Sequence, residues 1–411
     1  KQGAFAVLDI LNTYFARMLE IIARSGGNLL EFTGDALLVQ FPADEERGDA
    51  ARAVRAGLRM QRAMAEFGDI ASEAGQFALG MRVGLHRGKF MAANIGTPRR
   101  MEVVLLGRAV YNAKIAEGAG KVGRVCLTRA TTNYIKGQFR HETGTKGHVL
   151  IQDNWQAGDG DDYELIPRQR RLARAMIFDR SETALLLEIE KLLDAVEPLA
   201  SYLPRTSLNQ LIESSTRGRV PSSYTKLTVL FVSLIGLPES VGMAREDEEQ
   251  GLVNSFSRLF ALINAIVESR SGLLKKVTYQ SSGSNILIYF GAPSAHTDDP
   301  QRAVHSAVEI REVVQNFPPI TVAGRPQPVV AQMGIATGDA FVVEVGVPRG
   351  RREFNVLGDA VNTAARLMAK AEPGAIYVTE EVRESVAGEF AATPLGEVAL
   401  KGKTAAPIFR L

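Results

Sequence analysis

The second half of the sequence repeats the first at an almost constant distance. The segment Asp49–Val54 corresponds to Asp299–Val304, which lies 250 residues further along the chain. Four pairs of glycines keep this distance to within one residue: Gly34 and Gly283, Gly84 and Gly334, Gly88 and Gly338, Gly107 and Gly358. Matches that hold one offset over many elements predict two copies of one domain. The length of 411 residues suits two such domains and a connector.

The predicted domain boundaries follow from this repeat. They give a first copy over 1–166, a partly helical connector over 167–223 and a second copy over 224–411. The connector begins with the basic run Arg168–Arg171, which is typical of a solvated domain edge. Residues Leu185–Leu203 have the apolar periodicity of a helix that ends at Pro204. Because this helix has an apolar face, we expect the connector to pack on the two copies.

Periodicity and turn residues assign the elements of the first copy. Apolar residues at helical spacing predict a helix over Leu8–Ala23 that ends at Gly26-Gly27. A hairpin should follow, with its tip at Thr33-Gly34-Asp35. The other predicted elements are the strands Asn28–Phe32, Ala36–Phe41, Phe77–Leu85, Val103–Leu106 and Arg124–Thr128, the helix Asp49–Phe67, and a helix after Gly107.

Composition and charge exclude several classes of protein. The hydrophobic content of 45%, the charged content of 23% and the formal net charge of +2 are those of an ordinary globular chain, and predict no nucleic-acid or anionic-membrane partner. Cys126 is the only cysteine, which excludes an internal disulfide and fits a reducing cytosol. No apolar run approaches the roughly eighteen residues of a membrane helix, and the amino end has no signal-peptide pattern. These features predict a cytoplasmic protein.

The stretch Phe354–Thr379 contains polar side chains that could bind or act on a ligand. It reads as a strand, a Gly358-Asp359 turn, a helix, a Pro-Gly turn and another strand. Asn362 and Arg366 are four residues apart, so one helix face carries an amide and a guanidinium one turn from each other. An amide beside a cation suits a sugar and a phosphate. The alternative is that the two residues belong only to a solvated helix face.

This stretch resembles the signature of class III nucleotidyl cyclases, which convert ATP or GTP to the cyclic 3′,5′-monophosphate. The resemblance implies that Asn362 orients the ribose and that Arg366 stabilises the transferring phosphoryl group. It covers nearly the whole chain except the connector. It also implies an α+β fold, in which two ferredoxin-like domains face each other head to tail with pseudosymmetry. Each would have a mainly antiparallel sheet, a βαββαβ palm and helices on one side.

In this family one domain supplies two metal-binding aspartates, and the other supplies the purine contacts and the Asn/Arg pair. Asp35, at the tip of the first hairpin, matches the second metal aspartate, and Mg²⁺ or Mn²⁺ would be held as two ions. A hard divalent cation takes one or two carboxylates together with phosphate oxygens, which such a tip can offer. The first metal aspartate is expected on a strand that would precede Lys1. Without that strand, a site holding only Asp35 would bind its metal pair poorly.

The two copies differ at these positions. In the second copy, Ser284 follows the hairpin glycine, and Ser233 stands where the first metal aspartate is expected. In the first copy, Tyr111 and Ile115 replace the Asn/Arg pair. Only one of the two pseudosymmetric sites can therefore be complete. This asymmetry resembles the tandem domains of soluble adenylyl cyclases and their bacterial relatives, which need no second chain to form the site.

The resemblance also assigns the nucleotide contacts. Adenine-reading members use a lysine on the hairpin strand and an aspartate or threonine seven residues before the catalytic asparagine. The equivalent positions hold Lys276 and Asn355, which favours ATP, although an amide can present either a donor or an acceptor. Arg82 and Lys401 match residues that hold the outer phosphates. Each of these cations could instead be an ordinary surface charge.

Two further possibilities remain open. The degenerate site could take a small effector, as bicarbonate does in soluble adenylyl cyclases: Lys114 stands at one anion-binding position, but Glu31 replaces the second basic residue. The rival to an enzyme is a regulatory module, without activity, that binds nucleotide or dimerises and controls a downstream domain. An aspartate in an apolar strand upstream of Lys1 would favour the enzyme.

Overall fold

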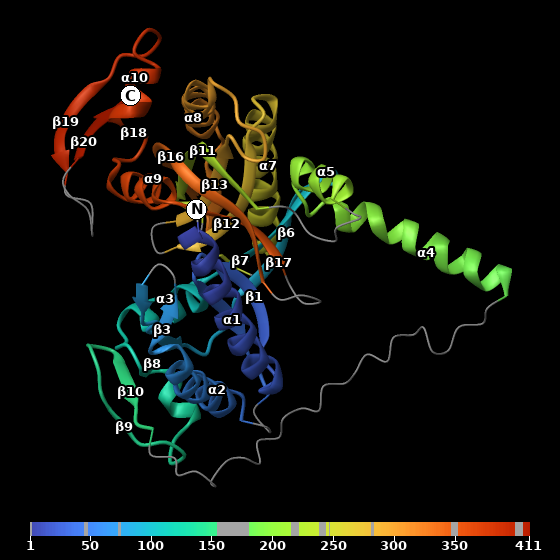
Figure 1. Cartoon of the computed structure of the whole chain (residues 1–411), viewed down its shortest axis with the longest axis vertical. Helices are drawn as coiled ribbons and strands as arrows, with labels where there is room; N and C mark the ends of the chain where they lie inside the picture. The colour runs from blue at the N-terminus through green and yellow to red at the C-terminus, as the bar shows by residue number, and fades with distance from the viewer. Residues whose placement is uncertain are drawn as a thin grey trace. The chain divides into compact units, whose positions relative to one another are not determined.

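A computed structural model shows the chain as two compact units (Figure 1). It describes residues 2–44, 48–72, 75–153, 181–214, 222–237, 244–245, 247–280, 283–346, 352–398 and 406–411. Unit 1 contains Lys1–Lys89, Arg108–Ile189 and Val345–Glu353. Unit 2 contains Phe90–Gly107, Glu190–Glu344 and Phe354–Leu411. Each unit therefore includes a segment from the other half of the sequence.

Unit 1 combines helices with short strands. Its helices are α1 (Gln2–Arg24), α2 (Asp49–Ala63) and α3 (Arg108–Gly118), with 3-10 turns η1 (Met64–Phe67) and η2 (Thr131–Tyr134). Its strands are β1 (Asn28–Thr33), β2 (Ala36–Gln40), β3 (Ile70–Ser72), β4 (Gly75–Phe77), β5 (Val83–Leu85), β8 (Val125–Thr128), β9 (His141–Thr143) and β10 (His148–Ile151). The strands β5, β8, β10 and β9 form a sheet in that order, and β1 pairs with β2.

The amino-terminal part of unit 1 confirms most of the predicted elements. The α1 helix packs on the β1–β2 hairpin through Phe15 and Phe32, whose rings meet edge to face with centroids 5.1 Å apart. The predicted strand 77–85 is wrong in its middle, because the Leu79 amide donates to the Phe67 carbonyl of η1 at 2.9 Å. That bond ties the segment to a turn of unit 1, and only its two ends are strands.

Unit 2 is built on one large sheet. Its strands are β11 (Ser223–Ile235), β12 (Leu273–Gln280), β13 (Gly283–Phe290), β16 (Val330–Gly346), β17 (Arg352–Leu357), β18 (Ile376–Thr379), β19 (Thr393–Val398) and β20 (Ala406–Arg410). They are ordered β12-β13-β11-β16-β18-β20-β19, with β17 paired to β16. Within this sheet β16 and β18 pair in parallel, whereas β12–β13, β13–β11, β11–β16, β18–β20 and β20–β19 pair antiparallel. Two smaller hairpins belong to the unit, β6 (Met91–Thr97) with β7 (Arg100–Leu106) and β14 (Ile320–Val322) with β15 (Arg325–Gln327).

Helices cover both faces of this sheet. The helices are α5 (Arg205–Glu213), α7 (Glu249–Ser269), α8 (Asp299–Gln315), α9 (Asp359–Lys370) and α10 (Glu380–Ser385). Alternate residues of β11 divide between two cores: Leu230 packs with α7 and α8, whereas Val229 packs with α9. The expectation of helices on one side is therefore wrong for unit 2, since α9 occupies the second face.

The element order of the first half recurs in the second at the predicted offset. The β3–β4 hairpin pairs Ile70 with Phe77, and the β14–β15 hairpin pairs Ile320 with Gln327. The parallel pairs also correspond, since Val83 is opposite Val125 and Met333 is opposite Ile376. These strands lie 250 or 251 residues apart in the chain, as the glycine pairs predict.

The β6–β7 hairpin comes from the first half of the sequence but packs within unit 2. Ser257 of α7 accepts a hydrogen bond from the Gly96 amide at 2.8 Å and donates to the Gly96 carbonyl at 2.9 Å. Ile95, Val104 and Leu106 of the hairpin are buried in the same core as α7. The compact units therefore do not coincide with the boundaries that the repeat predicts.

The connector behaves differently along its length. The Met101 amide donates to the Ser201 carbonyl at 2.7 Å, and Ser201 and Ser207 are buried in unit 2. The helix α4 (Glu182–Ala200), which contains Pro198, has no buried residue in the described structure. The prediction that the connector packs on the domains is thus confirmed for residues 201–214 and wrong for α4.

Candidate active site

The helix α9 carries the predicted Asn/Arg pair. Gly358 precedes it with extended backbone, and Asp359 places a carboxylate in its first turn, where the helix dipole favours negative charge. Ala360, Ala364 and Leu367 are buried against the sheet. Asn362 is exposed and Arg366 half-buried. Because four residues make about one helical turn, both side chains lie on the face of α9 that points away from the sheet.

A glycine of the sheet sets how closely α9 approaches. A Cβ atom on Gly334 of β16 would lie 2.3 Å from the Ala364 carbonyl oxygen and 2.3 Å from the Met368 nitrogen. No side chain fits there, so the backbone of α9 rests directly on β16. Gly84 has the same role in unit 1, where a Cβ atom would lie 2.0 Å from the Glu117 nitrogen of α3.

Lys276 reaches the α9 face of the sheet because of an irregularity in β12. The register of β12 against β13 shifts between Leu274 and Lys276, so Lys275 is an extra residue, as in a β-bulge. Lys276 is consequently opposite Leu287, which belongs to the same apolar cluster as Ala364 of α9. A regular strand would place Lys276 on the other face, since successive side chains alternate.

Asn355 lies on β17, directly before the turn that starts α9. Its neighbours Phe354 and Val356 face the apolar cluster under α9, so the Asn355 side chain lies on the other face of β17. The Asn355 Oδ1 atom accepts a hydrogen bond from the Val356 amide at 2.9 Å. The amide nitrogen of this half-buried side chain is therefore the group that it presents outward.

Asp35 lies in unit 1, at the tip of the β1–β2 hairpin. Gly34 adopts a positive φ of 66° there, which turns the chain and leaves Asp35 exposed. The pKa of Tyr14 on α1 is raised to about 12. The main cause is burial of the hydroxyl, and the negative charge of Asp35 is the second cause. The Tyr14 hydroxyl donates to Met81 Sδ at 3.4 Å. Sequence reasoning missed Tyr14, because an aromatic residue in an apolar helix face signals only a core position.

The two predicted phosphate contacts have different outcomes. Arg82 is exposed in unit 1, where its Nε atom pairs with Glu117 Oε1 at 2.8 Å. The structure describes no position for Lys401, which lies outside the described residues. Unit 1 therefore holds Asp35 and Arg82, and unit 2 holds the other described candidates, Lys276, Asn355, Asn362 and Arg366.

The structure also describes the positions at which the second copy lacks the metal aspartates and the first copy lacks the Asn/Arg pair. Ser233 of β11 and Ser284 of β13 are fully buried, and neither hydroxyl has a hydrogen-bond partner among the described residues. Ser233 is directly opposite the buried Asn285. In unit 1, Tyr111 and Ile115 lie on α3, with Ile115 40% exposed. An apolar side chain in the place of the guanidinium cannot stabilise a phosphoryl group.

The proposed effector residues both lie in unit 1. Lys114 is half-buried on α3, and Glu31 is half-buried on β1, next to the point where the β1–β2 register shifts. An acid at the second position disfavours an anion by charge repulsion.

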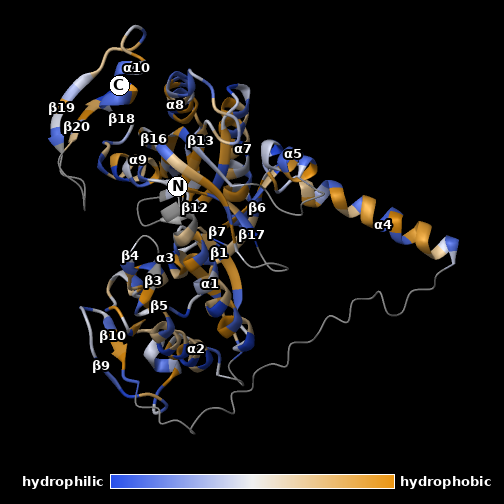
Figure 2. Cartoon of the chain, in the orientation of Figure 1, coloured by the Kyte–Doolittle hydropathy of each residue, from blue (hydrophilic) through white to orange (hydrophobic). Residues whose placement is uncertain are grey.

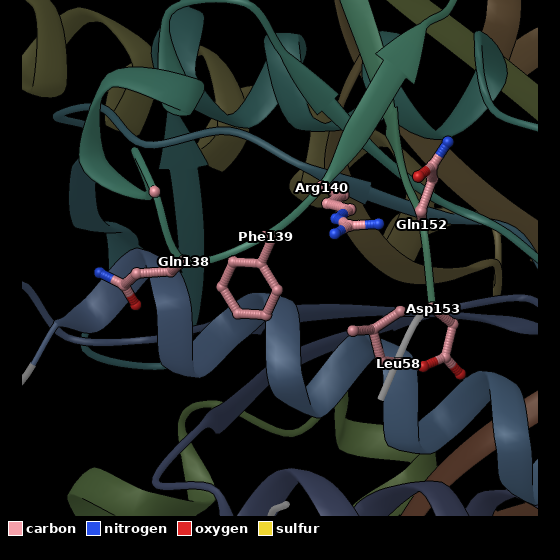
Figure 3. Close-up of a pocket in the computed structure, with 7 residues that line it drawn as sticks. Leu58, Gln138, Phe139, Arg140, Gln152 and Asp153 are labelled. Atoms are coloured by element: carbon pink, nitrogen blue, oxygen red, sulfur yellow. The ribbon is translucent and has the colours of Figure 1, made fainter. Parts of the chain in front are cut away.

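A separate hollow of about 350 Å³ occurs in unit 1 (Figure 3). Its labelled residues come from α2 and from the chain around β9 and β10, namely Leu58, Gln138, Phe139, Arg140, Gln152 and Asp153. Arg62 binds Asp153 with two hydrogen bonds of 2.7 and 2.6 Å. None of the predicted site residues lines this hollow.

The described ranges lack a preformed metal cluster and a membrane-spanning helix. They contain no group of three or more His, Cys, Asp or Glu residues arranged to hold a metal ion. A single exposed carboxylate at a hairpin tip, such as Asp35, still fits a magnesium ion that takes its other ligands from phosphate and water. No helix in the described part of the chain is long and apolar enough to cross a membrane.

Comparison with known protein families identifies the chain. The family described as adenylate and guanylate cyclase catalytic domain matches residues 1–161 and 220–411. The chain therefore belongs to this family of class III nucleotidyl cyclases. The matched segments leave out the connector, as the sequence resemblance does.

Individual relatives are adenylate cyclases. Adenylate cyclase type 10 of Oryctolagus cuniculus is 23% identical over 397 residues, covering 89% of this chain and 22% of that protein. An adenylate cyclase of Mycobacterium tuberculosis is 29% identical over 206 residues, covering 50% of this chain and 43% of that protein. The chain thus spans less than half the length of these relatives. Among solved structures, the adenylyl cyclase CyaB from P. aeruginosa is 23% identical, with a TM-score of 0.41, covering 46% of this chain and 95% of that one.

Proposed function

We propose that the chain is the catalytic region of an adenylate cyclase, which converts ATP to 3′,5′-cyclic AMP and pyrophosphate. The observation that carries the proposal is α9, which holds Asn362 and Arg366 one turn apart on the face away from the sheet. Family membership and the adenylate cyclase relatives support it. Both units contribute residues to one complete site in this proposal.

The reaction is an intramolecular phosphoryl transfer. The ribose 3′-oxygen forms a bond to the α-phosphorus, the bond from that phosphorus to the bridging oxygen breaks, and pyrophosphate leaves with the electron pair. The 3′-hydroxyl releases its proton to solvent water, and no side chain of this chain is assigned as a general base. Asn362 holds the ribose in the attacking position, and Arg366 offsets the charge that develops on the phosphoryl oxygens. Positioning and electrostatics therefore supply the catalysis.

Asp35 is the residue of this chain that we assign to Mg²⁺ or Mn²⁺. Two such ions, when bound, would lower the pKa of the 3′-hydroxyl and stabilise the leaving oxygens. The exposure of Asp35 leaves its carboxylate free to approach a metal–nucleotide complex.

Base recognition is assigned to Lys276 and Asn355. The bulge in β12 supports this role for Lys276, because it puts the ammonium group on the face of the sheet that α9 covers. A lysine with a small polar partner favours adenine, as the family resemblance implies. We therefore propose ATP as the substrate.

Arg82 and Lys401 are assigned to the outer phosphates. Binding through Arg82 requires its ion pair with Glu117 to open. Both side chains of that pair are 43% exposed, so opening costs at most about 1 kcal/mol. A triphosphate with its metal ions is a stronger partner than one exposed carboxylate.

A regulatory module without activity is the second candidate. Ser233 and Ser284 favour it, because these buried serines stand where the family resemblance expects metal-binding carboxylates in one of the two pseudosymmetric sites. In this alternative the chain binds nucleotide or dimerises, and controls a downstream domain. A small effector at the degenerate site, near Lys114 and Glu31, is compatible with either candidate.

The test measures cyclic nucleotide formation from ATP and from GTP with Mg²⁺ or Mn²⁺, on a chain extended upstream of Lys1. The variant Arg366→Ala is compared with Arg258→Ala, which removes an exposed arginine from α7 of the same unit. Product from ATP that falls by about 100-fold or more in the first variant and persists in the second supports the proposal. No product from either nucleotide, with folded protein and metal present, favours the regulatory module.

A further inference from the structure

The helix α4 presents an unusual number of exposed aliphatic side chains. Leu185, Ile189, Leu192, Val196 and Leu199 are 49% to 68% exposed in the described structure. Hydrophobic colouring recurs along the whole of α4 in Figure 2. An exposed apolar surface of this kind on a helix marks a site for another surface.

These five residues follow the spacing of a coiled coil. The intervals between them are four, three, four and three residues, which places Leu185, Leu192 and Leu199 at one core position of a heptad and Ile189 and Val196 at the other. In heptad notation the leucines occupy d and the β-branched residues occupy a. That combination favours two parallel strands over higher assemblies.

The flanks of this seam determine which partner fits. Leu186 and Leu193 occupy the e positions, and Glu188 and Ala195 occupy the g positions. A parallel pair of α4 helices therefore brings Glu188 of one copy toward Leu193 of the other, with no like-charge pair across the seam. The helix carries five acidic residues and one lysine, so it is poorly suited to an anionic lipid surface.

The area available matches a weak dimer. A fully exposed aliphatic side chain contributes roughly 60–120 Å², so the seam and its two e-position leucines offer roughly 250–500 Å² from each copy. The sum for two copies, roughly 500–1,000 Å², reaches the lower limit of about 1,000 Å² for specific interfaces only at its upper end. The association should therefore depend on concentration.

We propose that α4 is a self-association helix, which pairs in parallel with α4 of a second copy of this chain. The proposal is independent of the cyclase assignment, because neither α4 nor its seam contains a candidate site residue. Its expected consequence is a dimer at micromolar concentrations that dissociates on dilution.

Sedimentation over a concentration series tests the proposal with two matched variants of the full chain. Leu192→Glu puts a carboxylate into the seam, whereas Leu187→Glu changes an equally aliphatic residue, 52% exposed, at the outer f position. We expect the wild type and Leu187→Glu to approach twice the monomer mass, and Leu192→Glu to remain monomeric with an unchanged unfolding midpoint. A wild type that is monomeric throughout, or a Leu192→Glu variant that dimerises normally, overturns the proposal.

Cross-linking tests the parallel orientation. Cys126 is the only cysteine of the sequence and is buried, so cross-linking reports on the introduced cysteine. In a parallel pair, Ile189→Cys places the same position of both helices together and should form a disulfide between copies when a mild oxidant is added. The exposed Leu187→Cys should not. Equal cross-linking of the two variants, or none in the first, contradicts the parallel pair.

Discussion

The side-chain oxygen of Asn355 accepts a hydrogen bond from the backbone amide of Val356, at 2.9 Å. This bond uses one lone pair of Oδ1, and both hydrogens of the amide nitrogen remain as donors. Adenine offers an amino group at the position where a partner of Lys276 would contact it, and an amino group needs an acceptor. A residue that presents an acceptor should therefore read adenine better than Asn355 does.

We expect Asn355→Asp to increase the preference for ATP over GTP about tenfold, because one additional hydrogen bond to a charged group contributes about 1.5 kcal/mol. The measurement is the ratio of kcat/KM for the two nucleotides in wild type and variant. Asn355→Leu, which presents neither donor nor acceptor, is the control and should not gain this preference. An unchanged ratio in the aspartate variant would show that position 355 does not contact the base.

The close approach of α9 to β16 gives a prediction about stability. In Gly334→Ala the new methyl group would meet the backbone of α9 at 2.3 Å, so the helix has to shift. We expect a loss of about 3 kcal/mol in the stability of unit 2, together with reduced cyclase activity, because Asn362 and Arg366 move with the helix. Hydrogen exchange of the α9 amides and cyclic AMP formation measure the two effects.

Gly251→Ala is the matched control for this prediction. Gly251 lies on α7 of the same unit, and a methyl group added there would meet no described atom within 4 Å apart from the helix's own backbone and its chain neighbours. A glycine in a helix costs up to about 1 kcal/mol relative to alanine, so this variant should be neutral or slightly stabilised. Equal losses in the two variants would contradict the role of close packing at Gly334.

The positions of several candidate site residues could be predicted because their signals are local. Gly358-Asp359 before an apolar periodicity specifies where α9 begins, and the four-residue spacing of Asn362 and Arg366 specifies their shared face. The hairpin tip at Asp35 is equally local, since the glycine before it adopts a positive φ. These features depend on residues that are neighbours in the sequence.

Features that depend on distant strands could not be predicted in the same way. The extra residue Lys275 exists only relative to the pairing of β12 with β13, so strand alternation alone does not reveal that Lys276 faces α9, and only the family resemblance selects Lys276. The packing of the β6–β7 hairpin against Ser257 joins residues about 160 positions apart. No periodicity within the hairpin specifies that partner.

Ser233 gives a prediction about a degenerate position. Its hydroxyl is fully buried, with no hydrogen-bond partner among the described residues. An unsatisfied buried hydroxyl costs about 1–3 kcal/mol, so Ser233→Ala should stabilise unit 2 by about 1 kcal/mol. Ser233→Asp, which places a family-like carboxylate at the same buried position, should destabilise it by about 3 kcal/mol or more. Hydrogen exchange of the β11 amides reports both changes, and a destabilising alanine would indicate a partner for the hydroxyl.

His86 gives a prediction about pH. Burial lowers the pKa of His86, and its ring nitrogens contact Thr128 Oγ1 at 2.8 Å and Asn112 Nδ2 at 3.3 Å. The Asn112 amide donates to Nε2, which can accept only while the ring is neutral. Protonation of the ring would place the Nε2–H donor of His86 against the amide donor of Asn112.

The sign of the effect follows from this lowered pKa. Below a pH of about 6.5 the unfolded chain binds a proton at His86 that the folded chain resists, so the free energy of unfolding decreases as the pH falls through that value. Above it, the full stability is retained. We expect hydrogen exchange of the β8 amides to show this loss between pH 7.5 and 5.5 in the wild type and less of it in His86→Asn. His305→Asn, which changes a histidine that is 43% exposed on α8, should keep the wild-type dependence. Equal dependence in all three proteins would exclude His86 as the titrating group.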